Sequence, residues 1–120
     1  MEKRVLCPAR VRQVPPHFSW VDHRLVRDGH ITGPGPEALA LYLALVTVGD
    51  ADGVSWYSTG LLSRLLGLAP GRVDRARRAL AERSLIAFEA PFYQVLSLEP
   101  SAAADLARVL AGGAGEGGRA

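Results

Sequence analysis

Residues 70–83, PGRVDRARRALAER, constrain the fold more than any other stretch of this chain. Val73, Ala76 and Leu80 recur at helical spacing and form one narrow apolar stripe. Three arginines lie away from this stripe: Arg72, Arg75 and Arg78. A helix of this kind buries one side and presents a basic side to solvent. The rest of the chain must therefore supply a core for it to pack against.

A second short helix is predicted just upstream, over residues 58–66, with Ser58 or Thr59 as its cap. Four leucines are expected to pack inward: Leu61, Leu62, Leu65 and Leu66. Gly67 ends this helix, so residues 67–69 alone join it to the basic helix. Two helices with so tight a connection predict a helix-turn-helix, in which the second helix enters a DNA groove.

A β-hairpin is predicted directly after the basic helix. Residues 85–89 and 92–98 alternate apolar and polar side chains, with Ala90-Pro91 as the turn between them. The expected fold class is therefore mainly α with a small β-hairpin (α+β), in the order of a winged helix-turn-helix.

Two further helices are expected nearer the N-terminus. Pro36 is well placed as the first residue of a helix over residues 36–49, which is apolar almost all round and so should be central and buried. A cap at Ser19 predicts a short helix that ends at Gly29. Its apolar side would consist of Trp20, Val21, Leu25 and Val26. Residues 49–53 form a turn, and residues 54–57 a short extended piece.

The chain divides into four segments by composition. Residues 1–18 form a basic, proline-containing arm that is expected to lie on the domain, or else is a poorly ordered terminus. Residues 19–99 form the domain, and residues 100–111 a short C-terminal helix. Residues 112–120 are a glycine-rich flexible tail.

Composition excludes several classes of protein. The chain has 120 residues, of which 48% are hydrophobic and 22% charged, as in an ordinary small globular domain. Its one cysteine, Cys7, cannot form an intramolecular disulfide, and no apolar run approaches the roughly 18 residues of a membrane span. A cytoplasmic, nucleoid-associated protein is therefore expected, with no membrane partner.

Charge is informative through its distribution, because the formal net charge is only +2. Residues 64–83 hold six arginines against two acidic residues, Asp74 and Glu82. A second basic cluster consists of Lys3, Arg4, Arg10 and Arg12. Arginine forms paired hydrogen bonds with phosphates and guanine edges, so both clusters favour a nucleic-acid partner.

The segment from about residue 21 to residue 98 resembles the winged helix-turn-helix family of plasmid replication initiators, primosomal helper proteins and bacterial regulators. The residues that carry the resemblance are LVRDGHI, EALALYLALV, DADGVSWYSTGLLSRLLGL and PGRVDRARRALAERSLI. The resemblance implies binding to double-stranded DNA, as a regulator or as an accessory factor of replication or of a mobile element.

Three positions depart from that family's pattern. Pro70-Gly71 replaces a start rich in Ser and Thr, and Ser84 stands where glycine normally ends the recognition helix. The hairpin has no Lys or Arg between residues 85 and 98, and Glu89 lies near its tip. Such a wing should bind phosphates poorly.

The candidate DNA contacts therefore lie on the two helices: Ser58, Thr59, Arg64, Arg72, Arg75 and Arg78. Ser58 or Thr59 also serves as the helix cap, and Arg77 is expected to pack its aliphatic stem near the apolar stripe with its charged head reaching outward. The arm residues Lys3, Arg4, Arg10 and Arg12 are a second candidate contact. A dimer or a partner protein is expected, because one such domain covers few base pairs.

The candidate protein interface consists of Phe88, Phe92, Tyr93, Leu106, Val109 and Leu110, which alternatively close the core. The aromatic hairpin leaves a second function open, that of a non-catalytic interaction module in a larger nucleoprotein assembly. No catalytic, cofactor or metal residues and no small-molecule substrate are expected. The nearby Asp22, His23, Asp28 and His30 match no metal-binding motif, and the chain has no glycine-rich phosphate loop.

Overall fold

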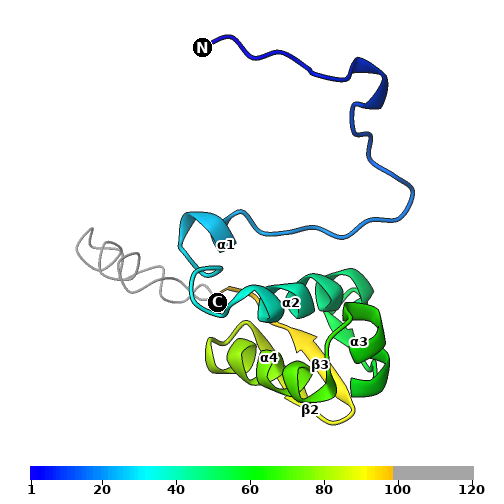
Figure 1. Cartoon of the computed structure of the whole chain (residues 1–120), viewed down its shortest axis with the longest axis vertical. Helices are drawn as coiled ribbons and strands as arrows, with labels where there is room; N and C mark the ends of the chain where they lie inside the picture. The colour runs from blue at the N-terminus through cyan, green and yellow to red at the C-terminus, as the bar shows by residue number, and fades with distance from the viewer. Residues whose placement is uncertain (99–120) are drawn as a thin grey trace, which may run out of the picture.

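The computed structural model describes residues 1–98 of the chain (Figure 1). In chain order the elements are η1 (Pro8–Arg10), α1 (Arg24–Arg27), α2 (Pro36–Val48), β1 (Val54–Ser55), α3 (Thr59–Leu66), α4 (Pro70–Glu82), β2 (Ile86–Glu89) and β3 (Phe92–Val95). The predicted C-terminal helix and glycine-rich tail, with Leu106, Val109 and Leu110, lie outside the described residues.

Helix α2 forms the centre of the domain and packs against α4, α3 and β3 (Figure 1). Pro36 occupies its first turn, as predicted, because proline fixes a helical φ where no N–H partner is needed. Its buried side chains are Ala38, Leu41, Tyr42 and Leu45. The central position is confirmed, but the burial is one-sided, since Leu43 is 62% exposed.

The apolar stripe of the basic helix is confirmed. Val73, Ala76 and Leu80 of α4 are all buried in the core against α2 and α3. The prediction for α3 was wrong in part, because of its four leucines only Leu62 is fully buried, whereas Leu61 and Leu65 are exposed. A helix of eight residues at the edge of the core has one narrow side to bury, so its flanking leucines face solvent.

The helix predicted from Ser19 was wrong in its start and its packing. The Asp22 carboxylate accepts hydrogen bonds from the backbone N–H and the guanidinium of Arg24, at 2.9 and 2.7 Å, and α1 begins only there. Trp20 and Val26 are exposed, and Leu25 alone of the four apolar residues is buried. The local carboxylate contacts compete with helical hydrogen bonds upstream of residue 24.

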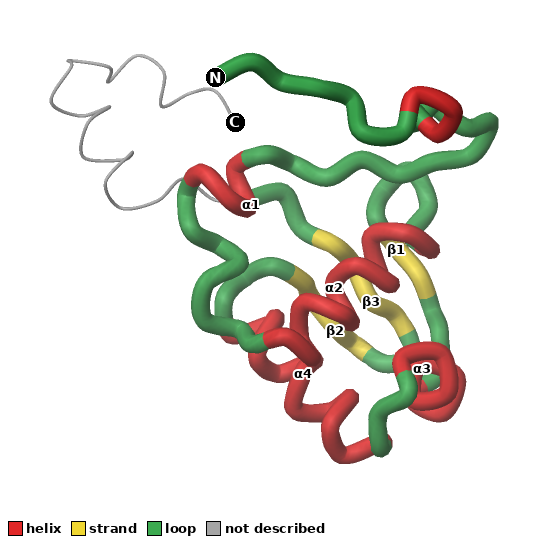
Figure 2. Tube along the Cα trace, turned by 45° about the horizontal axis from the view of Figure 1, so that its top comes forward, coloured by secondary structure: helices red, strands yellow, loops and turns green. Residues whose placement is uncertain are grey.

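The three strands form an antiparallel sheet in the order β1-β3-β2 (Figure 2). The hairpin of β2 and β3 is confirmed, with Phe88 paired to Tyr93 and Glu89 to Phe92. The sequence predicted β1 only as an extended piece, and the structure pairs it with β3 through Ser55 and Tyr93. Helices followed by a small three-stranded sheet confirm the α+β fold class and are compatible with winged helix-turn-helix topology.

The arm does not lie on the domain, contrary to prediction. Every residue from Met1 to Trp20 is exposed, and the arm runs beyond α1 and away from the hairpin turn (Figures 1 and 2). It contains the short 3₁₀ turn η1. The hydrogen bond from Ser19 to the carbonyl of Thr47, at 3.4 Å, joins the root of the arm to α2. The basic residues of the arm are thus held apart from those of α4.

The C-terminus of α4 closes with a Schellman motif built on Ser84. The Leu85 N–H donates to the carbonyl of Leu80 at 3.0 Å, and the Ser84 N–H donates to that of Ala81 at 3.0 Å. Ser84 has a φ of 58°, in the left-handed region that glycine tolerates and other residues adopt at a cost. The serine at this position therefore reduces the stability of the motif.

We expect Ser84→Gly to raise the free energy of unfolding by about 1 kcal/mol, because glycine removes the left-handed penalty. Urea denaturation followed by circular dichroism measures this change. Gly67→Ala is the matched control, since Gly67 ends α3 with a φ of 69° and open space around it. The control should lose about 1 kcal/mol. A destabilised Ser84→Gly variant would contradict the assignment.

Candidate nucleic-acid interface

The solvent face of α4 is formed around Arg75 and Arg78. Both side chains are exposed and lie three residues apart, so they point from the same side of the helix, away from the buried stripe. Within residues 1–98 neither arginine takes part in an ion pair or a side-chain hydrogen bond. Two guanidinium groups are therefore free to bind an anion.

Arg72 lies on the flank of α4 that faces α2. Its guanidinium is 3.0 Å from the carboxylate of Glu37, with the two side chains 55% and 42% exposed. Exposed pairs of this kind contribute at most about 1 kcal/mol, so a phosphate can replace Glu37 at little cost. Arg72 thus belongs to the same surface as Arg75 and Arg78. Unlike them, it must release Glu37 before it can bind an external anion.

Arg77 lies on the opposite flank and is an internal residue. Its guanidinium donates to the hydroxyl of Tyr93 at 3.1 Å and to the hydroxyl of Thr59 at 2.9 Å. It also pairs with Asp74 at 2.5 Å and lies 4.5 Å from the centre of the Phe88 ring. Arg77 therefore joins α4 to α3 and to both strands of the hairpin.

The prediction for Arg77 was right about the packed stem but wrong about the charged head, which was expected to reach outward and instead bonds to Tyr93 and Thr59. The side chain is 15% exposed. Burial lowers the pKa of this guanidinium, but the contacts with Tyr93 and Asp74 outweigh it and raise the pKa. Arg77 therefore stays positively charged, and its charge is neutralised by Asp74 within the fold. Arg77 cannot serve as a DNA contact without giving up this network.

The same network revises one predicted contact. The Thr59 hydroxyl accepts a hydrogen bond from Arg77, so it points into the fold rather than toward a phosphate. Ser58 is the N-cap of α3, and its hydroxyl accepts from the N–H of Leu61 at 3.1 Å, as expected. Arg64 is exposed in the last turn of α3. Of the predicted contacts on α3, Ser58 and Arg64 thus stay accessible.

The four basic residues of the arm are exposed, but the structure does not bring them together with α4. They extend beyond α1, at the other end of the domain from the hairpin turn (Figure 1). The candidate contacts therefore form two separate groups: the helix face around Arg75 and Arg78, and the arm.

The predicted aromatic interface is corrected at Tyr93. This side chain is 1% exposed and packs in the core, with its ring 4.5 Å from that of Phe88. Phe92 points the other way and is 52% exposed. It lies beside Trp56, which the sequence analysis did not single out, with ring centres 6.3 Å apart. The pairing of β1 with β3 brings these rings together. Strand β1 has only two residues, which is too few for the sequence pattern to reveal this pairing.

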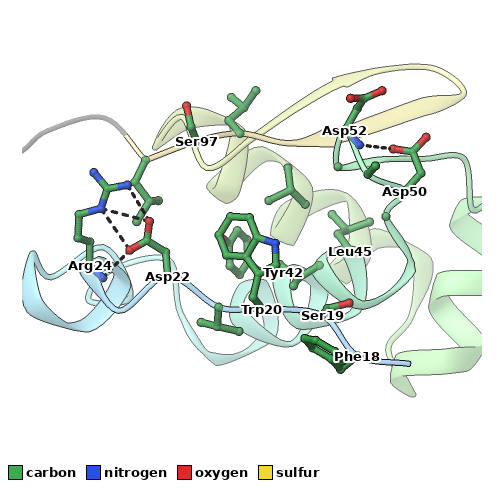
Figure 3. A pocket seen from close by; sticks show the side chains of 18 residues that line it. Phe18, Ser19, Trp20, Asp22, Arg24, Tyr42, Leu45, Asp50, Asp52 and Ser97 are labelled. Atoms are coloured by element: carbon green, nitrogen blue, oxygen red, sulfur yellow. Dashed lines mark hydrogen bonds and ion pairs between the residues drawn. The ribbon is translucent and has the colours of Figure 1, made fainter. Parts of the chain in front are cut away.

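A cavity of about 560 Å³ lies beneath the root of the arm (Figure 3). Trp20 and Tyr42 both line it, and the turn with Asp50 and Asp52 forms part of its lining (Figure 3). At its other end the guanidinium of Arg24 hydrogen-bonds to Asp22 and lowers the pKa of that carboxyl to about 2. The pair thus remains ionised at neutral pH and balances its own charge.

No family model, curated protein or solved structure gives a significant match to this chain. Within the described part of the chain, no helix has the length and apolar character to cross a membrane. Across residues 1–98, no three His, Cys, Asp or Glu side chains gather into a group that could hold a metal ion.

We expect Arg77→Ala to lower the free energy of unfolding by about 2 kcal/mol, because it leaves buried polar groups of the hairpin and α3 without a partner. Thermal or urea denaturation measures this loss. Arg78→Ala, one residue along the same helix, removes an exposed arginine and should change stability by less than about 0.5 kcal/mol. Equal stability of the two variants would contradict the internal role of Arg77.

Proposed function

We propose that this protein binds double-stranded DNA through α4, as a winged helix-turn-helix protein. The main observation in support is that the arginines of α4 differ in their partners. Arg77 is held inside the fold, whereas Arg75 and Arg78 have no partner in the described chain and face solvent together. Two unpaired guanidinium groups on one helix face are suited to phosphates and guanine edges.

The neighbouring groups support the same surface. Arg72 is held by one exposed carboxylate that a phosphate can replace. Arg64 is exposed on α3, the helix that precedes α4 in the proposed helix-turn-helix. In this arrangement α4 lies in the major groove, and Ser58 at the start of α3 contacts a phosphate through the free backbone N–H groups of the first turn.

The hairpin contributes little to DNA binding in this proposal. It carries no Lys or Arg from residue 85 to residue 98, and Glu89 near its tip repels phosphate. Binding then depends chiefly on α4, and the basic residues of the arm are a second candidate contact with an adjacent groove wherever the arm is not bound to another chain. A weak, strongly salt-dependent interaction is expected from a single domain, and tighter binding from a dimer or a larger assembly. The biological role would be that of a regulator or of a replication or mobile-element accessory factor.

A second candidate function is that of a non-catalytic interaction module in a nucleoprotein assembly. The exposed ring pair of Trp56 and Phe92 favours it, because exposed neighbouring aromatic side chains are typical of protein interfaces. The two functions are compatible, since they use different side chains: Arg75 and Arg78 on α4, and the ring pair on the sheet. They predict different results for substitution of Arg75 and Arg78, which should weaken DNA binding only if α4 contacts DNA.

We expect the slope of log affinity against log salt concentration to fall by about one in each of Arg75→Ala and Arg78→Ala, and by about two in the double variant. Fluorescence anisotropy with a random duplex over a range of salt concentrations measures these slopes. Arg27→Ala is the control, because Arg27 is exposed on α1. Its slope should equal that of the parent. If the double variant bound like the parent, α4 would not be the DNA-binding helix.

A further inference from the structure

Among residues 1–98, the outer face of the sheet carries an exposed aromatic pair. Side chains alternate between the two faces of a strand, and paired residues share a face. Tyr93 and Ser55 are paired and buried on the inner face, so Phe92 and Trp56 lie on the outer one. Their rings meet edge to face at 76°, with Trp56 62% and Phe92 52% exposed. A large apolar area thus faces solvent.

The strand segments around this pair contribute one carboxylate, Glu89, and no basic side chain. Glu89 pairs with Phe92, and Ala87 and Val54 both pair with Gln94, so these side chains share the outer face and line a shallow hollow beside the rings. No Lys or Arg occurs between residues 28 and 63 or between residues 85 and 98. We call this surface the outer patch: Val54, Trp56, Ala87, Glu89, Phe92 and Gln94.

The arm has the opposite chemistry. It carries four basic residues against one acidic residue, Glu2, and three prolines that favour an extended chain. It also exposes six large apolar side chains to solvent: Met1, Val5, Leu6, Val11, Val14 and Phe18. Extended proline-containing segments dock on aromatic surfaces, and arginine stacks on tryptophan with a carboxylate beside it. The arm and the outer patch therefore complement each other in apolar character, and the carboxylate of Glu89 complements the basic residues of the arm.

We infer that the outer patch receives the arm of a second copy of this chain. The arm leaves its own domain beyond α1, away from its own hairpin turn, and is exposed along its whole length (Figures 1 and 2). Fully extended, eighteen residues span at most about 60 Å, roughly twice the diameter of a small domain, and the turn η1 shortens this reach only locally. Each chain offers one arm and one patch, so reciprocal exchange closes a twofold dimer.

The single cysteine lies in the arm and gives a direct test. Cys7 is exposed, and a nitroxide attached to it broadens the NMR signals of nuclei near the arm. We would mix the unlabelled, nitroxide-bearing chain with ¹⁵N-labelled Cys7→Ser chain, so that only contact between two copies broadens signals. The expected result is broadening of the Trp56 indole N–H and of the Ala87 and Gln94 amides. No DNA is present, so the result is independent of DNA binding.

The reverse mixture separates the other arrangements. A ¹⁵N-labelled, nitroxide-bearing chain diluted into excess unlabelled Cys7→Ser chain reports contact within one copy. Broadening of outer-patch signals in this mixture alone would overturn the inference in favour of an arm folded back on its own domain. Broadening in neither mixture would overturn the docking of the arm altogether.

Variants of each surface complete the test. Trp56→Ala with Phe92→Ala should abolish intermolecular broadening and convert dimer to monomer in light scattering. Leu43→Ala, which removes an equally exposed apolar side chain from α2, should leave both unchanged. The double variant Arg10→Glu with Arg12→Glu changes two exposed residues outside the folded core. It therefore tests the contact between arm and outer patch without affecting the fold. We expect this variant to be monomeric and Glu89→Arg to restore its dimer; a dimeric arm variant would overturn the inference.

Discussion

The packing of α4 against α2 is the contact on which the rest of the structure depends. Val73, Ala76 and Leu80 bury one side of α4 against the central helix, and this fixes the rotation of α4 about its axis. This rotation determines the direction in which each of the other α4 side chains points. Arg77 must face the hairpin, Arg72 must face α2, and Arg75 and Arg78 must face solvent. A pattern of small apolar residues thus decides which positive charges are free.

The arginines of one helix therefore serve different purposes in spite of their identical chemistry. Arg77 stabilises the junction of α3, α4 and the hairpin through three hydrogen-bonding partners and an aromatic ring. Arg72 forms an exposed pair that is weak enough to be exchanged. Arg75 and Arg78 keep their full capacity for an external anion. The net charge of +2 does not show this distribution, because it counts all arginines alike, whereas in residues 1–98 Arg72 and Arg77 are paired with carboxylates and Arg75 and Arg78 are not.

The sequence predicted the elements that have strong local signals and missed those that depend on contacts between distant residues. Proline at Pro36, the stripe of Val73, Ala76 and Leu80, and the alternation of the hairpin are local, and each is confirmed. The pairing of β1 with β3 involves only two residues of β1, too few to show a period. The bonds of Arg77 with Thr59 and Tyr93 span 18 and 16 residues. No spacing rule relates such positions, so Thr59 was predicted as a phosphate contact and Tyr93 as interface.

The pairing of β1 with β3 has one more consequence. Strand β1 ends just before α3 and β3 lies just beyond α4 and β2, so the sheet joins the two ends of the segment that contains the helix pair. The exposed connection at Gly67 lies inside this closed loop. A chain cut there would keep its two fragments together through the sheet and the core, whereas a cut in an unpaired segment would release them.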